Sequence, residues 1–350
     1  MHRIDWLLIT LLTLIALLAG GFHLGIDQDA YYLPAVQQQL NPSLYPNDIY
    51  LHALNRYVTF FYFGLALLAR PTSIFIAFLI AHLITMFLFI TAIFLFSYHL
   101  FHRRAPAILT SLFLTLPQPA LGGINVGLNH GYIYQSFAAF PLLLLGIYCL
   151  IRRRYLIATL LVGLISLIQS LTAIHLLALI ALIAGFRWFI LGLALLLPVT
   201  LRNWQLQVLT PAISFADWLL INKLRSSHHL FPLSWSLTTW LQGLWPIIPI
   251  ILIKPFRRLL VGSLIIFIPA LIFTEIIPSR VIIQLQFFRL SQWFVVLGWL
   301  SLSYFLLQLK PLWLKFMLIF VLLVITLKPA HKNPFTTFAI SAHDQDWLNA

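Results

Sequence analysis

Long, uninterrupted runs of apolar residues are the feature that most limits what this chain can fold into. The ranges 6–22, 72–101 and 313–327 are almost wholly apolar. A helix that crosses a bilayer needs about 20 such residues, and a backbone in lipid must satisfy its own hydrogen bonds. The runs are continuous rather than alternating, which is typical of helices. The sequence therefore predicts several membrane-spanning α-helices.

The composition excludes a soluble protein. Hydrophobic residues make up 61% of the chain and charged residues 8%, whereas soluble domains average about 25% charged residues. The first apolar run is long and has no small-residue cleavage site, so we interpret it as a retained helix rather than a signal peptide. Cys149 is the single cysteine, so disulfides play no part.

Clusters of basic residues predict the orientation in the membrane. Lys and Arg beside membrane spans tend to remain in the cytoplasm. The clusters are Arg3, Arg103 with Arg104, Arg152 to Arg154, Arg187, Lys254 with Arg257 and Arg258, and Lys310 with Lys315. If all are cytoplasmic, that side holds 12 of the 21 basic residues but only one of the 8 acidic residues. We expect about 11 crossings, a cytoplasmic N-terminus and an extracytoplasmic C-terminus.

The predicted fold is an all-α, polytopic integral membrane helical bundle. Residues 1–328 form one membrane domain, and 329–350 form a short extracytoplasmic tail. The outer loops are expected at 23–71, 121–135, 202–240 and 274–289. The stretch 50–70 suits amphipathic helix lying in the membrane interface. The stretch 156–186 is too short for two full spans, so it predicts two short or re-entrant helices that meet near Gln169 and Ser170.

An acidic pair follows the first predicted helix directly. Asp27 and Asp29 lie at the membrane surface and are separated by one residue. In extended backbone their carboxylates point the same way, so they could share a metal ion or divide the roles of base and positioning group. The structural alternative is that one of them caps a helix that starts near Tyr31. The two interpretations are compatible.

The overall pattern resembles the GT-C superfamily of membrane glycosyltransferases. The likeness lies in the acidic pair, the large first outer loop, about ten further membrane segments and the polar outer tail. The segments 31–34 (Tyr-Tyr-Leu-Pro) and 44–48 (Leu-Tyr-Pro-Asn-Asp) are also similar to uncharacterised bacterial membrane proteins related to that superfamily. The resemblance implies a plasma-membrane enzyme that moves a sugar from a polyprenyl-phosphate carrier to an extracytoplasmic acceptor in cell-envelope synthesis.

By the same resemblance, Asp27 or Asp29 corresponds to the acidic residue of the first loop in that superfamily, with Mg²⁺ or Mn²⁺ as the divalent metal that the pair could hold. One departure is the short tail at 329–350, where members usually carry a sizeable soluble domain. A truncated or inactive relative is therefore a further interpretation.

Further candidate residues lie in the later outer loops. Arg289 and Arg280, with Glu275 nearby, could bind the phosphate of a lipid carrier, because arginine matches phosphate geometry. Their structural alternative is an anchor that reaches to the membrane interface. Asn129 and His130 could hydrogen-bond a sugar, although a lone loop histidine is more often structural.

Other function classes receive less support from the sequence. Topology anchors beside anionic lipid, such as Arg152 to Arg154, explain the net charge of +13 without a nucleic-acid partner. The main alternative to an enzyme is a non-enzymatic multi-pass protein such as a transporter or a component of a lipid flippase. A transporter would place its key polar residues near the bilayer midplane rather than at the first loop.

Overall fold

A computed structural model describes residues 2–25, 28–48, 51, 59–208 and 213–327, which are mostly helical. The α-helices are α1 (Arg3–Gly20), α2 (Gln28–Leu40), α4 (Phe61–Ala69), α5 (Ile74–Phe101), α6 (Ala105–Phe113), α7 (Gln135–Ile151), α8 (Tyr155–Ile168), α9 (Ser170–Ile183), α10 (Phe186–Val208), α11 (Phe215–Leu230), α12 (Leu237–Leu244), α13 (Ile247–Ile251), α14 (Lys254–Leu271), α15 (Arg280–Leu285), α16 (Ser291–Gln308) and α17 (Leu312–Leu327). The short elements are strands β1 (Gln118–Ala120) and β2 (Ile124–Val126), the 3-10 helices η1 (Pro232–Ser234) and η3 (Phe287–Leu290), and the π-helix η2 (Ile272–Ile276).

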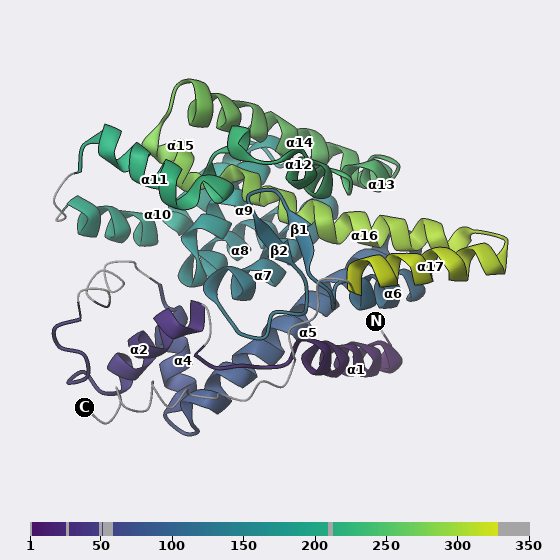
Figure 1. Ribbon diagram of the computed structural model, residues 1–350, viewed down its shortest axis with the longest axis horizontal. Coiled ribbons are helices and arrows are strands. Elements are labelled where there is room, and N and C mark those ends of the chain that lie inside the picture. Colours follow the sequence, from purple (N-terminus) through teal and green to yellow (C-terminus); the bar gives the residue numbers. More distant parts are fainter. Residues whose placement is uncertain (1, 26–27, 49–50, 52–58, 209–212, 328–350) are drawn as a thin grey trace.

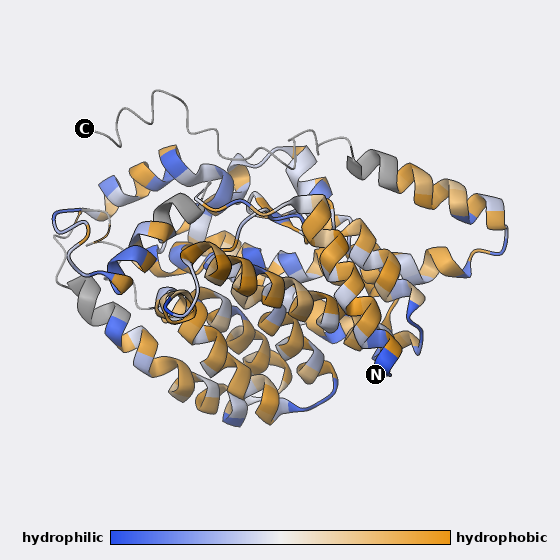
Figure 2. Ribbon diagram, turned by 90° about the horizontal axis from the view of Figure 1, so that it is seen from below, coloured by the Kyte–Doolittle hydropathy of each residue, from blue (hydrophilic) through white to orange (hydrophobic). Residues whose placement is uncertain are grey.

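Four helical segments among the described residues are long and apolar enough to cross a membrane. They are Arg3–Gly20, Ile74–Phe101, Lys254–Ile276 and Arg280–Gln308. Among the shorter apolar helices, α7 packs against α5 and α9 against α14, while α8 packs against both α7 and α9. Hydrophobic residues dominate the helices, and hydrophilic residues gather in loops and at helix ends (Figure 2). The mainly helical, apolar fold is confirmed, and the count of about 11 crossings stays a prediction.

Helix α16 is the centre of the hydrophobic core. It runs through the middle of the molecule, and α17 folds back along its end (Figure 1). Trp293 of α16 is fully buried. Trp299 donates a hydrogen bond from Nε1 to Oε1 of Gln118 (3.0 Å), and Thr110 Oγ1 donates to Ser303 Oγ (3.0 Å). These buried bonds tie α16 to α6 and β1, which satisfies polar groups that would be costly to bury alone.

Two apolar segments that the sequence counts among the 11 or so expected crossings, 105–120 and 241–253, are not single helices. In the range 105–120 only residues 105–113 are α-helical, and the chain then enters an antiparallel β-hairpin of β1 and β2. Pro117 and Pro119 explain the end of this helix, because proline lacks an N–H and disfavours helix at the residue before it. The expected crossing at 105–120 is therefore helical only in its first part, while the chain as a whole is mostly helical. In the range 241–253, Pro246 lies in the break between α12 and α13.

The predicted pair of short helices is confirmed. Helices α8 and α9 have 14 residues each and pack against each other, with extended backbone at Gln169 between them. Each is about 21 Å long, shorter than the roughly 30 Å hydrocarbon core of a bilayer. Phe60 N donates to Leu167 O (2.8 Å), and Thr59 Oγ1 donates to Ile168 O (2.9 Å). The chain before α4 thus satisfies carbonyls at the end of α8.

The segment predicted as the first outer loop (23–71) contributes to a second, smaller hydrophobic core. Helices α2 and α4 pack together there, with Val36, Leu65 and Phe78 buried between elements. The amphipathic stretch predicted at 50–70 contains α4, which is helical from Phe61 to Ala69. The polar residues that motivated its interfacial placement, at 52, 55 and 56, lie outside the described residues, so that placement stays a prediction.

Candidate functional site

The N-terminal end of α1 lies at the same end of the bundle as the arginines that follow α5 and α7. Asp5, in the first turn of α1, forms an ion pair with Arg104 (Oδ1 to Nε, 2.7 Å) just after α5. Arg152 Nη1, just after α7, lies 2.9 Å from Nδ1 of His99 near the end of α5. We call this the basic end, because it brings together the N-terminal end of α1 and the arginines after α5 and α7.

The other end of α1 contacts the second predicted outer loop. A Cβ atom at Gly20 would lie only 2.9 Å from Cα of Asn129, so the helix end and the loop are in close contact there. His23 N donates a hydrogen bond to Gly131 O (2.6 Å). The first and second loops therefore meet at the end of α1 opposite Asp5. We call this the loop end.

His229 joins the third loop to the second. Its Nδ1 lies 2.6 Å from the carbonyl oxygen of Gly122. Burial lowers the pKa of His229 below its usual value, and the neighbouring charges of His228 and Arg289 lower it further, while the hydrogen bond to Gly122 acts in the opposite direction. The ring therefore favours its neutral form, with Nδ1–H as the donor to Gly122.

The fourth loop contacts the third through two predicted site residues. Glu275 Oε1 accepts a hydrogen bond from Leu233 N (2.8 Å). Arg280 Nη2 donates to Ile213 O (3.2 Å), and its guanidinium lies 5.2 Å from the centre of the Trp218 ring. Both residues thus have contacts that hold loops together, and the phosphate-binding role and the interface-anchor alternative for Arg280 both stay predictions.

His130 belongs to an aromatic cluster at the loop end. Its Nε2 lies 3.3 Å from the Tyr134 hydroxyl, and its ring centre lies 4.9 Å from that of Phe137. Asn125, His130 and Gln292 line a small cavity beside these rings, with a volume of about 10 Å³. That volume suits one water molecule. A sugar would therefore contact His130 from the loop surface rather than inside this cavity.

Arg289 lies between the loop end and the short helix pair. It sits in η3, half-buried, and it is close enough to His229 to affect the pKa of that residue. His175, buried in α9, has Nε2 2.8 Å from the carbonyl oxygen of Leu285, four positions before Arg289. The segment that carries Arg289 is thereby connected both to the third loop and to α9.

The acidic pair is only partly within the described chain. Asp27 lies outside the described residues, and Asp29 is the second residue of α2, with its side chain outside the description. Helix α2 begins at Gln28 rather than near Tyr31, so Asp29 lies in the first helical turn, where the helix dipole favours it, and is not the N-cap. The capping interpretation stays a prediction for Asp27. Among the described residues no group of three or more His, Cys, Asp and Glu side chains gathers as metal ligands would. The predicted Mg²⁺ or Mn²⁺ site at Asp27 and Asp29 stays a prediction.

No protein-family model, curated protein sequence or solved structure matches the chain. The resemblance to the GT-C superfamily therefore stays a prediction.

Sequence reasoning missed Gln292 and the contact between His229 and Gly122. Gln292 was detectable as a polar residue within the apolar run that follows Arg289. The pairing of His229 with Gly122 spans 107 positions, and no local pattern in the sequence indicates it.

Proposed function

We propose that this chain is a membrane glycosyltransferase of the GT-C type. It would move a sugar from a polyprenyl-phosphate carrier to an extracytoplasmic acceptor in the synthesis of cell-envelope glycan or glycoprotein. The observation that carries the proposal is the contact between the end of α1 and the second loop, at Gly20 with Asn129 and at His23 with Gly131. This contact holds the segment leading to Asp27 and Asp29 beside Asn129 and His130.

The chemistry of such a transfer needs two kinds of group. A carboxylate at Asp27 or Asp29 would take the proton from the acceptor hydroxyl. A guanidinium at Arg289 would stabilise charge on the leaving phosphate. The aromatic rings around His130 offer flat apolar surfaces of the kind that line small-molecule sites.

The same proposal includes the orientation in the plasma membrane. The basic end would face the cytoplasm and the loop end would face outward, with about 11 crossings between the termini. The contacts Asp5 with Arg104 and His99 with Arg152 support an even number of crossings between successive basic clusters.

The test compares lipid-linked sugars, by mass spectrometry of extracted lipids, in cells with and without the protein. Donor lipid should accumulate when the protein is missing. The double variant Asp27→Asn, Asp29→Asn should reproduce that accumulation, whereas Asp48→Asn, a matched loss of charge in the same loop, should not. Normal donor turnover in the double variant would exclude the acidic pair as the catalytic centre.

A transporter or flippase component is the second candidate, and the pair α8–α9 favours it. His175, Thr172 and Ser170 are buried in this otherwise apolar pair of short helices. Polar residues in broken membrane helices commonly mark a transport pathway. Proteoliposomes would then move a labelled lipid or solute without sugar transfer, and His175→Leu would stop that movement while leaving the amount of folded protein unchanged.

A further inference from the structure

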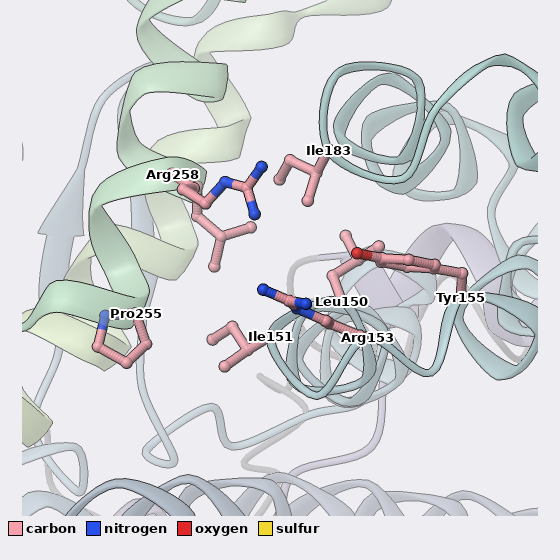
Figure 3. Close-up of a pocket in the computed structure, with 8 residues that line it drawn as sticks. Leu150, Ile151, Arg153, Tyr155, Ile183, Pro255 and Arg258 are labelled. Carbon is pink, nitrogen blue, oxygen red and sulfur yellow. The ribbon is translucent and has the colours of Figure 1, made fainter.

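A cavity lies at the basic end, between the turn that joins α7 to α8 and the first turns of α14 (Figure 3). Its volume is about 160 Å³. Its polar lining consists of the side chains of Arg153, Tyr155 and Arg258. Its apolar lining includes Leu150, Ile151 and Ile183.

Two positive charges face this cavity, and neither has a partner among the residues that the structure describes. The guanidinium groups of Arg153 and Arg258 and the hydroxyl of Tyr155 all point toward the same space (Figure 3). Within the described part of the chain, the one ion pair is that of Asp5 with Arg104, and neither cavity arginine has a side-chain hydrogen bond. Two like charges that share a cavity repel each other, so the arrangement favours an anion between them.

Arg153 has a strained, left-handed backbone conformation, and its side chain lines the cavity. Its φ is +56°, a left-handed conformation that helix ends usually assign to glycine. The turn completes the hydrogen bonding of α7, because Arg153 N donates to Leu150 O (3.0 Å) and Arg154 N donates to Cys149 O (2.8 Å). Glycine would make the same turn without strain, but it would leave the cavity with one guanidinium.

The starts of two helices add positive potential beside the cavity. Tyr155 is the first residue of α8, and Lys254 is the first residue of α14. Neither helix has a side-chain cap at its N-terminus. Uncapped N–H groups and the helix dipole both favour an anion at such a position, which supports the evidence from the two arginines.

The surroundings of the cavity suit the edge of a bilayer. The ring centres of Tyr155 and Trp188 are 6.3 Å apart, and the guanidinium of Arg187 lies 5.0 Å from the centre of the Trp188 ring. Trp, Tyr and Arg gather where membrane meets water. Exposed leucines, including Leu156 and Leu252, lie close by in sequence. A polar mouth bordered by such residues matches a ligand with a charged head and apolar chains.

We propose that this cavity binds a phosphate group, with Arg153 and Arg258 donating to its oxygens from two sides and Tyr155 donating a third hydrogen bond. The size fits, since a cavity of about 150 Å³ accommodates a ligand as large as benzene. The headgroup of an anionic phospholipid and free phosphate share this chemistry. The site lies at the opposite end of the bundle from the loops, so it does not depend on the proposed sugar transfer.

The first arm of the test measures lipid binding by the full chain. The protein is reconstituted in nanodiscs of phosphatidylcholine with and without phosphatidylglycerol, and native mass spectrometry measures the phosphatidylglycerol that it retains. R153G removes one guanidinium and relieves the positive φ, so the fold should be kept, and R258Q removes the other guanidinium. The matched controls R154Q and K254Q remove neighbouring charges that do not line the cavity.

Retention should fall about tenfold in R153G and in R258Q, because a hydrogen bond to a charged group contributes at least that factor to affinity. It should stay near the wild-type level in R154Q and K254Q. An equal fall in all four variants would mean diffuse attraction to the membrane surface and would overturn the site. Unchanged retention in R153G and R258Q would overturn a headgroup site and leave free phosphate, tested in the second arm, as the only remaining ligand.

The second arm separates the two sources of phosphate. Thermal unfolding is followed in a neutral detergent with inorganic phosphate, and with chloride at the same ionic strength. A higher Tm in phosphate for the wild type and R154Q, but not for R153G, would identify free phosphate as a ligand. Lipid retention without that rise would identify the headgroup. Absence of binding in both arms would overturn the proposal.

Discussion

Asp5 is fully buried, and three groups contact its carboxylate. The hydroxyl of Tyr98 donates to Oδ1 (2.6 Å), Arg104 pairs with the same oxygen (2.7 Å), and His2 N donates to Oδ2 (2.5 Å). A buried carboxylate that loses a partner is costly, because its remaining charge is neither hydrated nor paired. This one side chain therefore links α1, α5 and the start of α6.

Tyr98→Phe should lower the free energy of unfolding by about 1 to 3 kcal/mol, since it removes a hydrogen bond to a buried charged group. The measurement is thermal or denaturant unfolding in a neutral detergent. Tyr148→Phe is the matched control, because the Tyr148 hydroxyl has no hydrogen bond within the described residues and its loss should change little. Equal effects of the two substitutions would contradict a special role for the bond to Asp5.

At Asp29, asparagine and alanine distinguish catalysis from a structural role in the first turn of α2. Asp29 is the second residue of α2, where the helix dipole favours a carboxylate. A structural role predicts that Asp29→Asn and Asp29→Ala each lower the free energy of unfolding by at most about 1 kcal/mol and keep normal sugar transfer. A role as general base predicts that both variants lose about 100-fold to 10,000-fold in sugar transfer and remain folded. Transfer assays alongside unfolding curves check this. Full transfer by the Asn variant would exclude Asp29 as the general base.

The stability of the loop end should depend on pH through His229. Its pKa is lowered by folding, so the unfolded chain binds the proton at a higher pH than the folded protein. The stability contributed by the neutral ring is present above about pH 6.5 and is lost as the pH falls from there through the folded pKa. His229→Asn keeps an amide donor for Gly122 and should flatten the dependence of Tm on pH in that window. A variant that retains the full slope would assign it to other groups.

At the scale of elements, close helix packing depends on one glycine of α16. A Cβ atom at Gly298 would lie 2.9 Å from Cα and from the carbonyl oxygen of Pro246, so backbone would have to move. Gly298→Ala should lower stability by about 1 to 3 kcal/mol through overpacking. Gly262→Ala in α14 is the control, since its Cβ would meet neighbours at an ordinary 3.8 Å and alanine favours helix. Unfolding curves of the two variants should therefore differ in sign or clearly in size.

Elements governed by local pattern could be predicted from the sequence. Apolar runs located α1 and α5 to within a few residues, and the length of the range 156–186 predicted the break at Gln169. The β-hairpin was missed although Pro117 precedes it and Pro119 lies in its first strand, because hydropathy alone continued the helix to residue 120.

The candidate site was less predictable than the helices. Its residues were chosen one by one, but the contacts that group them, such as His23 with Gly131, join distant segments. Tertiary packing alone sets those contacts. The side chains of the acidic pair lie outside the described residues, so the part of the site with the strongest sequence signal stays a prediction.

For the whole molecule, the division into a basic end and a loop end predicts which residues a membrane-impermeant reagent can reach. Single-cysteine variants at Arg103, Arg154 and Arg257, made in a Cys149→Ala background, should react with a membrane-impermeant thiol reagent only after the membrane is opened. Variants at Ser43 and Ser236 should react in intact cells, because the positive-inside rule assigns the loop end to the outside. Labelling of Arg154→Cys in intact cells would overturn the proposed orientation.

The central position of α16 has a consequence for how the protein is made. The hydrogen-bond partners of Trp299 and Ser303 are Gln118 and Thr110, which lie 181 and 193 positions earlier in the chain. The amide of Leu121 donates to Ser291, which lies 170 positions later. At about 5 to 20 residues per second, Gln118 emerges from the ribosome some 10 to 40 seconds before Trp299. During that interval Gln118, Thr110 and Leu121 lack the hydrogen-bond partners that they have in the folded protein. The helix at the centre of the core is therefore synthesised after most of the segments that pack around it.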